Sequence, residues 1–211
     1  MAGLPCMRMR ISTLPLVLAL ALGAGCSSGP SAPDDSEYLE ELAAARAQKD
    51  QQFREAPDSP VPSGQRETML PLSYYPIDPG YAIPAALKLA GERPVFEIPT
   101  SSGALRRMQL VGTLEFTFQG APRSLGAFAP EGTRQITDLF VPFADATTGE
   151  ETYFAGRYLD IEPTTTGFYT IDFNLAYNPY CAYNDSYECP FPPPSNRLEV
   201  PIRAGEKAPG A

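Results

Sequence analysis

The chain has 211 residues, 24 of them proline, with 43% hydrophobic residues, a formal net charge of −9 and no histidine. This length and hydrophobic content suit one folded domain of moderate size rather than a disordered chain. The missing histidine excludes Ser-His-Asp and Cys-His catalysis and every zinc site that uses histidine. The acidic charge argues against a nucleic-acid binder, which needs a clustered basic surface.

Residues 8–26, RMRISTLPLVLALALGAGC, have the pattern of an export signal. Arg8 and Arg10 give a positive start, and the apolar run that follows is shorter than the roughly 20 residues of a membrane-spanning helix. Small residues then precede Cys26. This resembles a bacterial lipoprotein signal, in which the cysteine is lipidated and becomes the new N-terminus. The alternative is an ordinary secretory signal in which Cys26 has no role.

The lipoprotein interpretation predicts a protein of the bacterial cell envelope, anchored by lipid at Cys26 to the outer membrane and facing the periplasm. Residues 1–25 would be the cleaved signal peptide, and residues 26–36 a flexible tether of small residues and proline. A helix is expected over residues 37–55, with one narrow apolar stripe on a mostly polar surface. We interpret this helix as a spacer.

From residue 56 to 207 the chain changes to short β-like runs separated by glycine and proline. Leu114, Phe116 and Phe118 alternate with polar residues, which is the period of a half-buried strand. Turns are expected at Gly103, Gly120 and Gly149, and further strands at residues 138–143, 151–160, 168–175 and 197–204. The pattern predicts a mainly β domain, a compact antiparallel sandwich or barrel of about seven or eight strands, with one N-terminal helix.

Several segments between residues 49 and 207 carry a family likeness. They read KDQQFR, SPVP, LSYYPIDPGY, LFVPFADATTGEETYFAGRYLD and DFNLAYNPYCAYNDSYECPFPPPSNRLEVPIRAGEK. These segments resemble the bacterial domain-of-unknown-function 1684 family, and the likeness covers residues from about 40 to 207. Because that family is named for its unknown function, the resemblance implies a domain boundary and no reaction.

Cys181 and Cys189 lie close together in the sequence, and in an oxidising periplasm such a pair is expected to form a disulfide. The alternatives are two buried free thiols, or a reactive or metal-binding pair, for which the segment offers neither a CxxC motif nor a histidine. We expect no metal and no cofactor. The proline run after Cys189 is interpreted as a rigid spacer packed on the domain's own tyrosines.

Polar residues near the end of the strand expected at 168–175 are the first candidates for a site. Asp172 and Asn174 would lie on one face of that strand, close to Asn178, and three such oxygen-bearing groups could hold Ca²⁺ or bind a sugar. The alternative is that these side chains cap backbone groups in a loop.

A second candidate is an ion pair. If residues 152–160 run antiparallel to residues 168–174, one register places Arg157 opposite Asp172. Glu151 or Tyr153 would then lie at the rim of a shared pocket, and the alternative is a purely structural salt bridge. Together, the residues predicted to bind a ligand are Asp145, Glu151, Tyr153, Arg157, Asp172, Asn174, Asn178 and Arg197.

Three functions are compatible with these residues. We favour a module that binds an unidentified small ligand or an envelope protein, and we expect no nucleic-acid partner. The second hypothesis is a hydrolase that uses Glu151 or Asp172 as base, with Arg157 stabilising an anion. The third is a purely structural envelope protein. Converging carboxylates in a concave site would favour the enzyme, and a shallow aromatic groove would favour the binding module.

Overall fold

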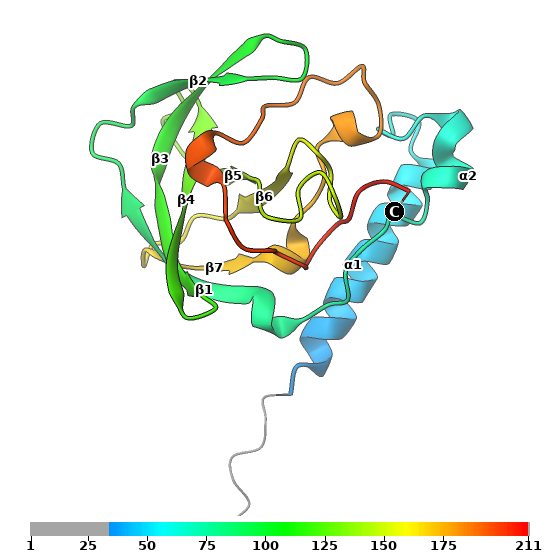
Figure 1. Ribbon diagram of the computed structural model, residues 1–211, viewed down its shortest axis with the longest axis horizontal. Helices are drawn as coiled ribbons and strands as arrows, with labels where there is room; N and C mark the ends of the chain where they lie inside the picture. The colour runs from blue at the N-terminus through cyan, green and yellow to red at the C-terminus, as the bar shows by residue number, and fades with distance from the viewer. Residues whose placement is uncertain (1–33, 211) are drawn as a thin grey trace, which may run out of the picture. The chain divides into compact units, whose positions relative to one another are not determined.

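The structure, a computed structural model, describes residues 34–210, so the predicted signal peptide and Cys26 lie outside the described residues. The described part is mainly β, which confirms the predicted fold class. Seven antiparallel strands form one sheet that curls into a half-barrel, and helices α1 (Ser36–Glu55) and α2 (Arg66–Met69) lie beside it (Figure 1). The helix predicted at the N-terminal end of the domain is therefore confirmed as α1.

The strands are β1 (Ala82–Leu89), β2 (Val95–Pro99), β3 (Leu105–Phe118), β4 (Ala121–Pro130), β5 (Leu139–Phe143), β6 (Arg157–Ile161) and β7 (Phe168–Asp172). Their order across the sheet is β6-β5-β4-β3-β1-β7, and β2 also pairs with β3. β6 and β7 therefore lie at the two ends of this order. The predicted antiparallel pairing of residues 152–160 with residues 168–174 is wrong, because β6 pairs with β5 and β7 pairs with β1.

The hairpin of β3 and β4 shows why the sequence pattern identified strands. Leu114, Phe116 and Phe118 are all buried, as their alternation predicts. The chain reverses at Gln119 and Gly120, whose φ angles of 52° and 73° are both positive. A two-residue turn with positive φ at both positions matches the right-handed twist of paired strands, and glycine adopts it without steric cost.

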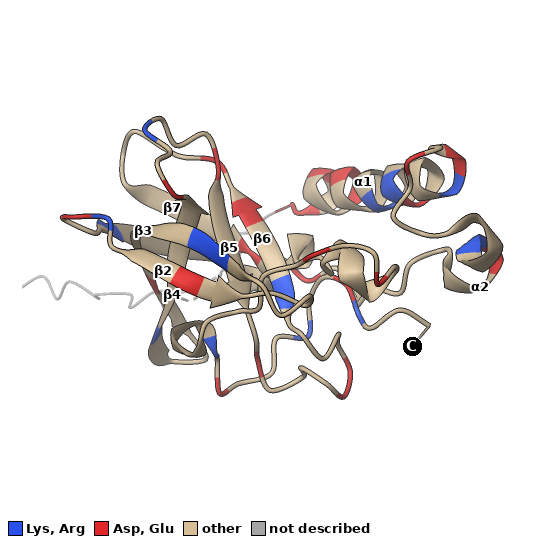
Figure 2. Ribbon diagram, turned by 90° about the horizontal axis from the view of Figure 1, so that it is seen from above, with Lys and Arg blue, Asp and Glu red and all other residues tan. Residues whose placement is uncertain are grey.

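Helix α1 contacts the rest of the domain along one narrow face. Leu42 and Phe53 are its buried residues, and the Phe53 ring lies 5.6 Å from the ring of Tyr183. Arg46, on the same face, donates to the backbone oxygens of Tyr75 and Asn174. Figure 2 shows acidic and basic residues along much of the rest of α1. Among residues 34–210, no helix is both long and apolar enough to cross a membrane.

The strand predicted at residues 197–204 is wrong. This segment makes a single bridge, between Arg197 and Ala144, and otherwise has no strand structure. The reason is that side chains, rather than a neighbouring strand, satisfy part of its backbone. The guanidinium group of Arg157 donates to the carbonyl oxygens of Ile202 and Ala204, and the Asp145 carboxylate accepts from the Ile202 N–H at 2.6 Å.

The side chain of Asn196 fills the place where β4 and β5 separate. The two strands pair at one position, Phe128 with Phe140. Asn196 is fully buried, its Oδ1 accepts from the Gly126 N–H at 2.7 Å, and its Nδ2 donates to the oxygens of Gly126 and Pro142, both at 2.8 Å. One amide therefore provides the hydrogen bonds that a missing strand residue would have made.

Candidate functional site

Two of the predicted site residues, Asp145 and Arg157, meet in the interior. Their side chains are 0% and 1% exposed, and Arg157 Nη2 lies 3.4 Å from Asp145 Oδ1. Nη2 also donates to the backbone oxygen of Ile202, and Nη1 donates to those of Ala204 and Glu206. Burial lowers the pKa of Arg157, and the Asp145 carboxylate opposes that change. The pair holds the C-terminal segment against the sheet and presents no surface to a ligand.

Glu206 is a second buried charge, and no sequence pattern pointed to it. It is 1% exposed, it pairs with Lys49 of α1, and its Oε2 accepts from the Tyr183 hydroxyl at 2.7 Å and from the Asn178 N–H at 2.8 Å. Burial, and then the Glu206 charge, raise the pKa of Tyr183 well above its usual value. Asn178, a predicted ligand residue, therefore serves this cluster, and its Nδ2 donates to the oxygen of Lys207.

Asp172 and Asn174 also have partners inside the domain. β7 ends at Asp172, before the predicted end at residue 175, and a short 3-10 helix follows. The Asp172 carboxylate accepts from the Asn174 N–H at 2.9 Å. Its second oxygen accepts from the Tyr38 hydroxyl of α1 at 2.8 Å. This supports the alternative in which these residues cap backbone groups. The predicted contact between Arg157 and Asp172 is wrong, because Arg157 binds Asp145 and backbone oxygens of the C-terminal segment, whereas Asp172 binds Tyr38 and Asn174.

The remaining predicted residues lie in three different surroundings. Glu151 pairs with Arg203 and accepts a hydrogen bond from the Tyr75 hydroxyl. The hydrogen bond from Arg203 lowers the pKa of Glu151. Burial, and then the hydrogen bond to Glu151, raise the pKa of Tyr75 to about 12. Tyr153 packs its ring on Phe154 at 4.7 Å. Arg197 lines a separate cleft. The structure thus does not bring the eight predicted residues into one site.

A hollow on another part of the surface has the size and lining of a ligand site. It has a volume of about 810 Å³, and we call it the aromatic groove. Its lining comprises the aromatic residues Phe140, Tyr158, Tyr177, Tyr180 and Tyr187, the apolar residues Met108, Pro130, Pro179, Cys189 and Pro190, and the charged residues Lys49, Arg106, Arg107, Asp160 and Glu188. Ligand pockets typically occupy about 300–1,000 Å³ and are lined mainly by apolar and aromatic side chains.

The aromatic side chains of the groove support each other edge to face. The ring centroids of Phe140 and Tyr158 are 4.8 Å apart, those of Tyr158 and Tyr177 5.8 Å, and those of Tyr180 and Tyr187 5.2 Å. Edge-to-face pairs fix ring orientation and are more favourable than a face-to-face sandwich. Tyr180 remains 44% exposed. The walls are therefore held in position and still present aromatic surface to a ligand.

The charged residues of the groove are paired within the domain. Arg107 binds Glu131 and Glu97, Arg106 binds Glu188, and the Tyr177 hydroxyl donates to Asp160 at 2.6 Å. Burial, and then Asp160, raise the pKa of Tyr177, so this hydroxyl stays protonated at neutral pH. The groove consequently offers aromatic surface edged by neutralised polar groups.

The cysteine loop forms one end of the groove. Cys181 and Cys189 are joined by a disulfide, which confirms the predicted bond. Closing a loop of this length should stabilise the fold by about 2–3 kcal/mol, because the disulfide lowers the conformational entropy of the unfolded chain. The Tyr158 hydroxyl donates to the oxygen of Pro190 at 2.6 Å, so the start of the proline run packs on one of the domain's own tyrosines.

None of the eight residues predicted to bind a ligand lines the groove, although one feature of the sequence pointed toward it. Tyr177, Tyr180 and Tyr187 occur within eleven residues around Cys181, and all three contribute rings to the groove. Tyrosines gathered around a stapled loop indicate a wall of aromatic side chains. Phe140 and Tyr158 come from β5 and β6, and no sequence spacing connects them to that loop.

Fold and groove together define the class of protein: a mainly β domain built on one curled sheet, with a groove of ligand size. The chain belongs to the family described as "Protein of unknown function (DUF1684)", whose model matches residues 68–207. It is similar to the solution NMR structure of an uncharacterized protein from Haloarcula marismortui, with 39% sequence identity and a TM-score of 0.65. That similarity covers 81% of this chain and 94% of the other. No curated protein matches the chain.

Proposed function

We propose that this protein is a binding module that takes a small ligand with a flat ring in the aromatic groove. The observation that carries the proposal is the set of five aromatic side chains around a hollow of about 810 Å³. A flat ring can lie against such walls and remove apolar surface from water on both partners. Glu151, Arg157 and Asp172, which the hydrolase hypothesis requires, lie outside the groove.

The polar groups of the groove favour an uncharged ligand that carries hydroxyl or amide groups. Because Arg106, Arg107 and Lys49 each have a carboxylate partner, binding a strong anion would compete with existing ion pairs. Tyr180 and Tyr187 have hydroxyls with no hydrogen-bond partner among the described residues, so they are available to a ligand. Buried ligand groups need such partners, because an unpaired polar group is costly to desolvate.

The groove predicts where fragments will bind. In an NMR titration with uncharged phenyl and pyranoside fragments, we expect saturable shifts confined to residues that line the groove. Tyr187→Ser removes one aromatic side chain of the groove, so it should weaken fragment binding by about 3- to 10-fold. It keeps the backbone carbonyl oxygen of residue 187, which accepts a hydrogen bond from the Ser101 hydroxyl. The measurement is the dissociation constant of each fragment for the wild type and the variant.

Phe154→Ser is the matched control, because Phe154 is 70% exposed and lies outside the groove. It should leave every dissociation constant unchanged. The proposal would be contradicted if Phe154→Ser weakened fragment binding as much as Tyr187→Ser, or if the fragments shifted resonances mainly outside the groove.

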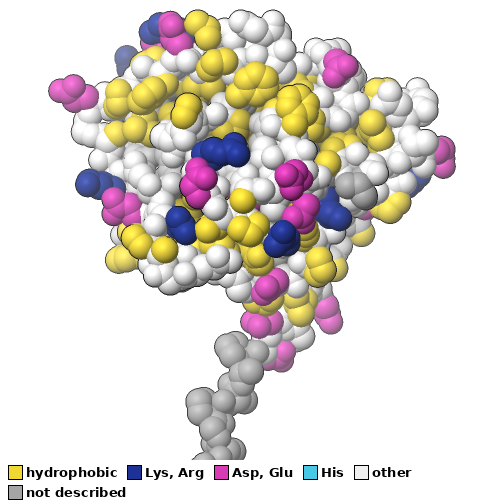
Figure 3. All heavy atoms as spheres, in the orientation of Figure 1, with side chains coloured by type: hydrophobic (Ala, Val, Ile, Leu, Met, Phe, Trp, Pro, Cys, Tyr) yellow, Lys and Arg dark blue, Asp and Glu magenta, His cyan; other side chains and the backbone are white. Residues whose placement is uncertain are grey.

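We further propose that the domain works at the bacterial cell envelope, attached by lipid at Cys26 to the outer membrane and facing the periplasm. The support is the pattern of Arg8, Arg10, an apolar run and small residues before a cysteine. On the face shown in Figure 3, acidic side chains gather at the N-terminal end of α1, and over the rest of the domain acidic and basic side chains are interspersed.

Expressed with its leader in a bacterial host, the chain should be recovered from membranes with an N-terminus at Cys26 and the added mass of acyl chains. Cys26→Ser should abolish the added mass and release the domain from the membrane fraction. Intact-mass spectrometry of the wild type and the variant measures the acyl mass. A wild-type chain recovered in the soluble fraction without acyl mass would refute the proposed lipid anchor.

A further inference from the structure

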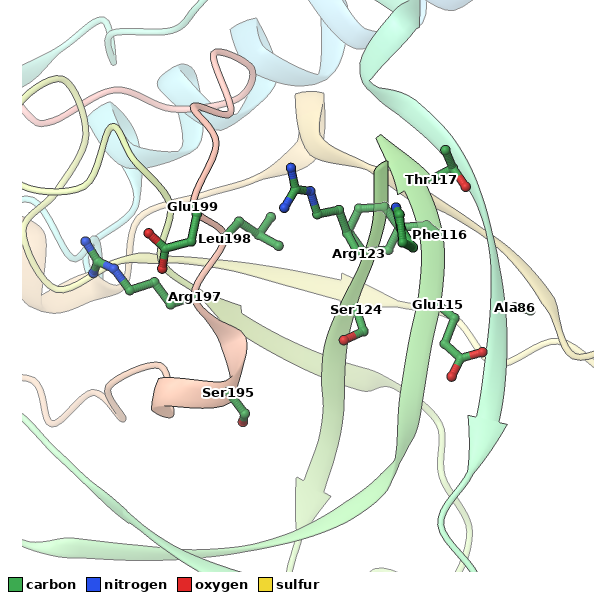
Figure 4. Close-up of a pocket in the computed structure, with 11 residues that line it drawn as sticks. Ala86, Glu115, Phe116, Thr117, Arg123, Ser124, Ser195, Arg197, Leu198 and Glu199 are labelled. Atoms are coloured by element: carbon green, nitrogen blue, oxygen red, sulfur yellow. The ribbon is translucent and has the colours of Figure 1, made fainter. Parts of the chain in front are cut away.

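A second hollow, of about 720 Å³, lies between the sheet and the C-terminal segment, and we call it the arginine cleft. Figure 4 shows its side chains coming from two directions. Glu115, Arg123 and Ser124 come from β3 and β4, whereas Ser195, Arg197 and Glu199 come from the segment that follows the proline run. The arginine cleft shares no lining residue with the aromatic groove.

The arginine cleft gathers polar side chains that have no partner. Most arginine side chains of the described chain bind a carboxylate or a backbone oxygen; those of Arg123, Arg134 and Arg197 make no hydrogen bond or ion pair within residues 34–210. Two of these three line the cleft. The Nε atom of Arg123 is buried as well as unpaired. A guanidinium left without an acceptor in a concave site is complementary to a carboxylate.

The acidic residues of the cleft are equally unpaired. Glu115 and Glu199 form no ion pair with Arg123 or Arg197, although all four line the same hollow. Thr117, Ser124 and Ser195 add hydroxyls that have no hydrogen-bond partner among the described residues. A simple anion would be repelled by the two carboxylates. A molecule that carries both a carboxylate and an ammonium group matches both sets of charges.

The cleft also contains a short free strand edge. The N–H and C=O of Gly126 point away from β3 toward Asn196. Backbone groups alternate in direction along an antiparallel strand, so those of Ser124, two residues earlier, point the same way. β4 pairs with β5 at Phe128 alone, and no described backbone group bonds Ser124 on this side. An extended peptide backbone can pair with such an edge.

From these observations we propose that the arginine cleft binds a short peptide with free termini, extended along β4 at Ser124. The peptide carboxylate lies against the guanidinium group of Arg123, whose Nε is buried and unpaired, and the ammonium group lies against Glu199. Arg197 lies farther from β4, beyond Glu199 as seen from Arg123 (Figure 4), and adds a more distant positive charge. Pro122 offers its carbonyl but no N–H, which limits the edge to a segment of a few residues. The proposal does not depend on the function assigned to the aromatic groove.

The probe for this site is trialanine, which has both terminal charges and minimal side chains. In a ¹⁵N NMR titration we expect saturable shifts at the amides of Ser124 and Gly126. Trialanine with an acetylated N-terminus and an amidated C-terminus should bind about 10-fold or more weaker, because it loses the charge-assisted hydrogen bonds. This comparison uses the unaltered protein, so it stands even if a variant fails to fold.

Arg123→Gln should weaken trialanine binding by about 10-fold, and Arg197→Gln, which removes a more distant charge, by about 2- to 3-fold. Arg134→Gln is the matched control, because Arg134 is the partnerless arginine outside the cleft, and it should have no effect. The proposal is overturned if trialanine gives no saturable shift at Ser124, if the blocked peptide binds equally well, or if the Arg134 variant weakens binding as much as the Arg123 variant. Any of these results would leave Pro122 and Arg123 as residues that merely protect a strand edge.

Discussion

Replacing Arg157 with methionine is expected to lower the free energy of unfolding by about 3–5 kcal/mol, a large part of the 5–15 kcal/mol typical of a domain. The methionine fills similar space without charge. It leaves the fully buried Asp145 carboxylate without its cation, and it leaves the carbonyl oxygens of Ile202 and Ala204 without a donor. Urea unfolding followed by circular dichroism measures the loss.

Arg203→Met is the control for this experiment. Arg203 also pairs with a carboxylate, that of Glu151, but its side chain is 56% exposed, so the variant should lose about 1 kcal/mol or less. Adding Asp145→Asn to the Arg157 variant should restore part of the lost stability, because it removes the unpaired charge. An Arg157 variant as stable as the Arg203 variant would show that the buried pair does not hold the C-terminal segment.

Replacing Asn196 with alanine is expected to cost about 2–4 kcal/mol, because three buried or partly buried backbone groups lose their partners at once. These are the N–H and C=O of Gly126 and the carbonyl of Pro142. The cost should be accompanied by a local effect, faster hydrogen exchange of the Gly126 amide, since that amide would no longer be bonded. Unfolding by urea and exchange measured by NMR test the two effects separately.

Asn184→Ala provides the comparison. Its side chain accepts a single exposed hydrogen bond, from the Ser186 N–H, and its loss should change stability by about 0.5 kcal/mol or less. Asn196→Asp should be nearly as harmful as Asn196→Ala, because a carboxylate cannot donate to the two carbonyl oxygens. If the aspartate variant kept full stability, the amide would not be the group that joins β4 to β5.

Those features of the fold that depend on local pattern could be predicted. Alternation from Leu114 to Phe118 identified a strand, and Gly120 identified the turn that follows it. Strand order could not be predicted, because pairing depends on contacts between residues far apart in sequence. The segment 197–204 has the composition of a strand, yet its backbone is bonded by the side chains of Arg157 and Asp145, and no local pattern reveals that.

The same limit applied to the candidate site. Asp172, Asn174 and Asn178 are polar residues near the end of a strand, and their sequence environment did not show that Tyr38 and Glu206 were their partners. Most residues of the predicted set are therefore ones whose side chains bond other parts of the domain. Of the predicted set, Arg197 is the residue that has no hydrogen-bond or ion-pair partner among residues 34–210 and lines an open cleft.

The contacts of α1 determine when the domain can complete its folding during synthesis. Lys49 pairs with Glu206, 157 positions later, and Tyr38 bonds Asp172, 134 positions later. The first strand of the sheet likewise pairs with the last. Contacts between such distant residues cannot form until both have left the ribosome, and they make folding slow. Before residue 206 emerges, α1 lacks the carboxylate that pairs with Lys49, so the domain can complete its packing only when nearly the whole chain has been made.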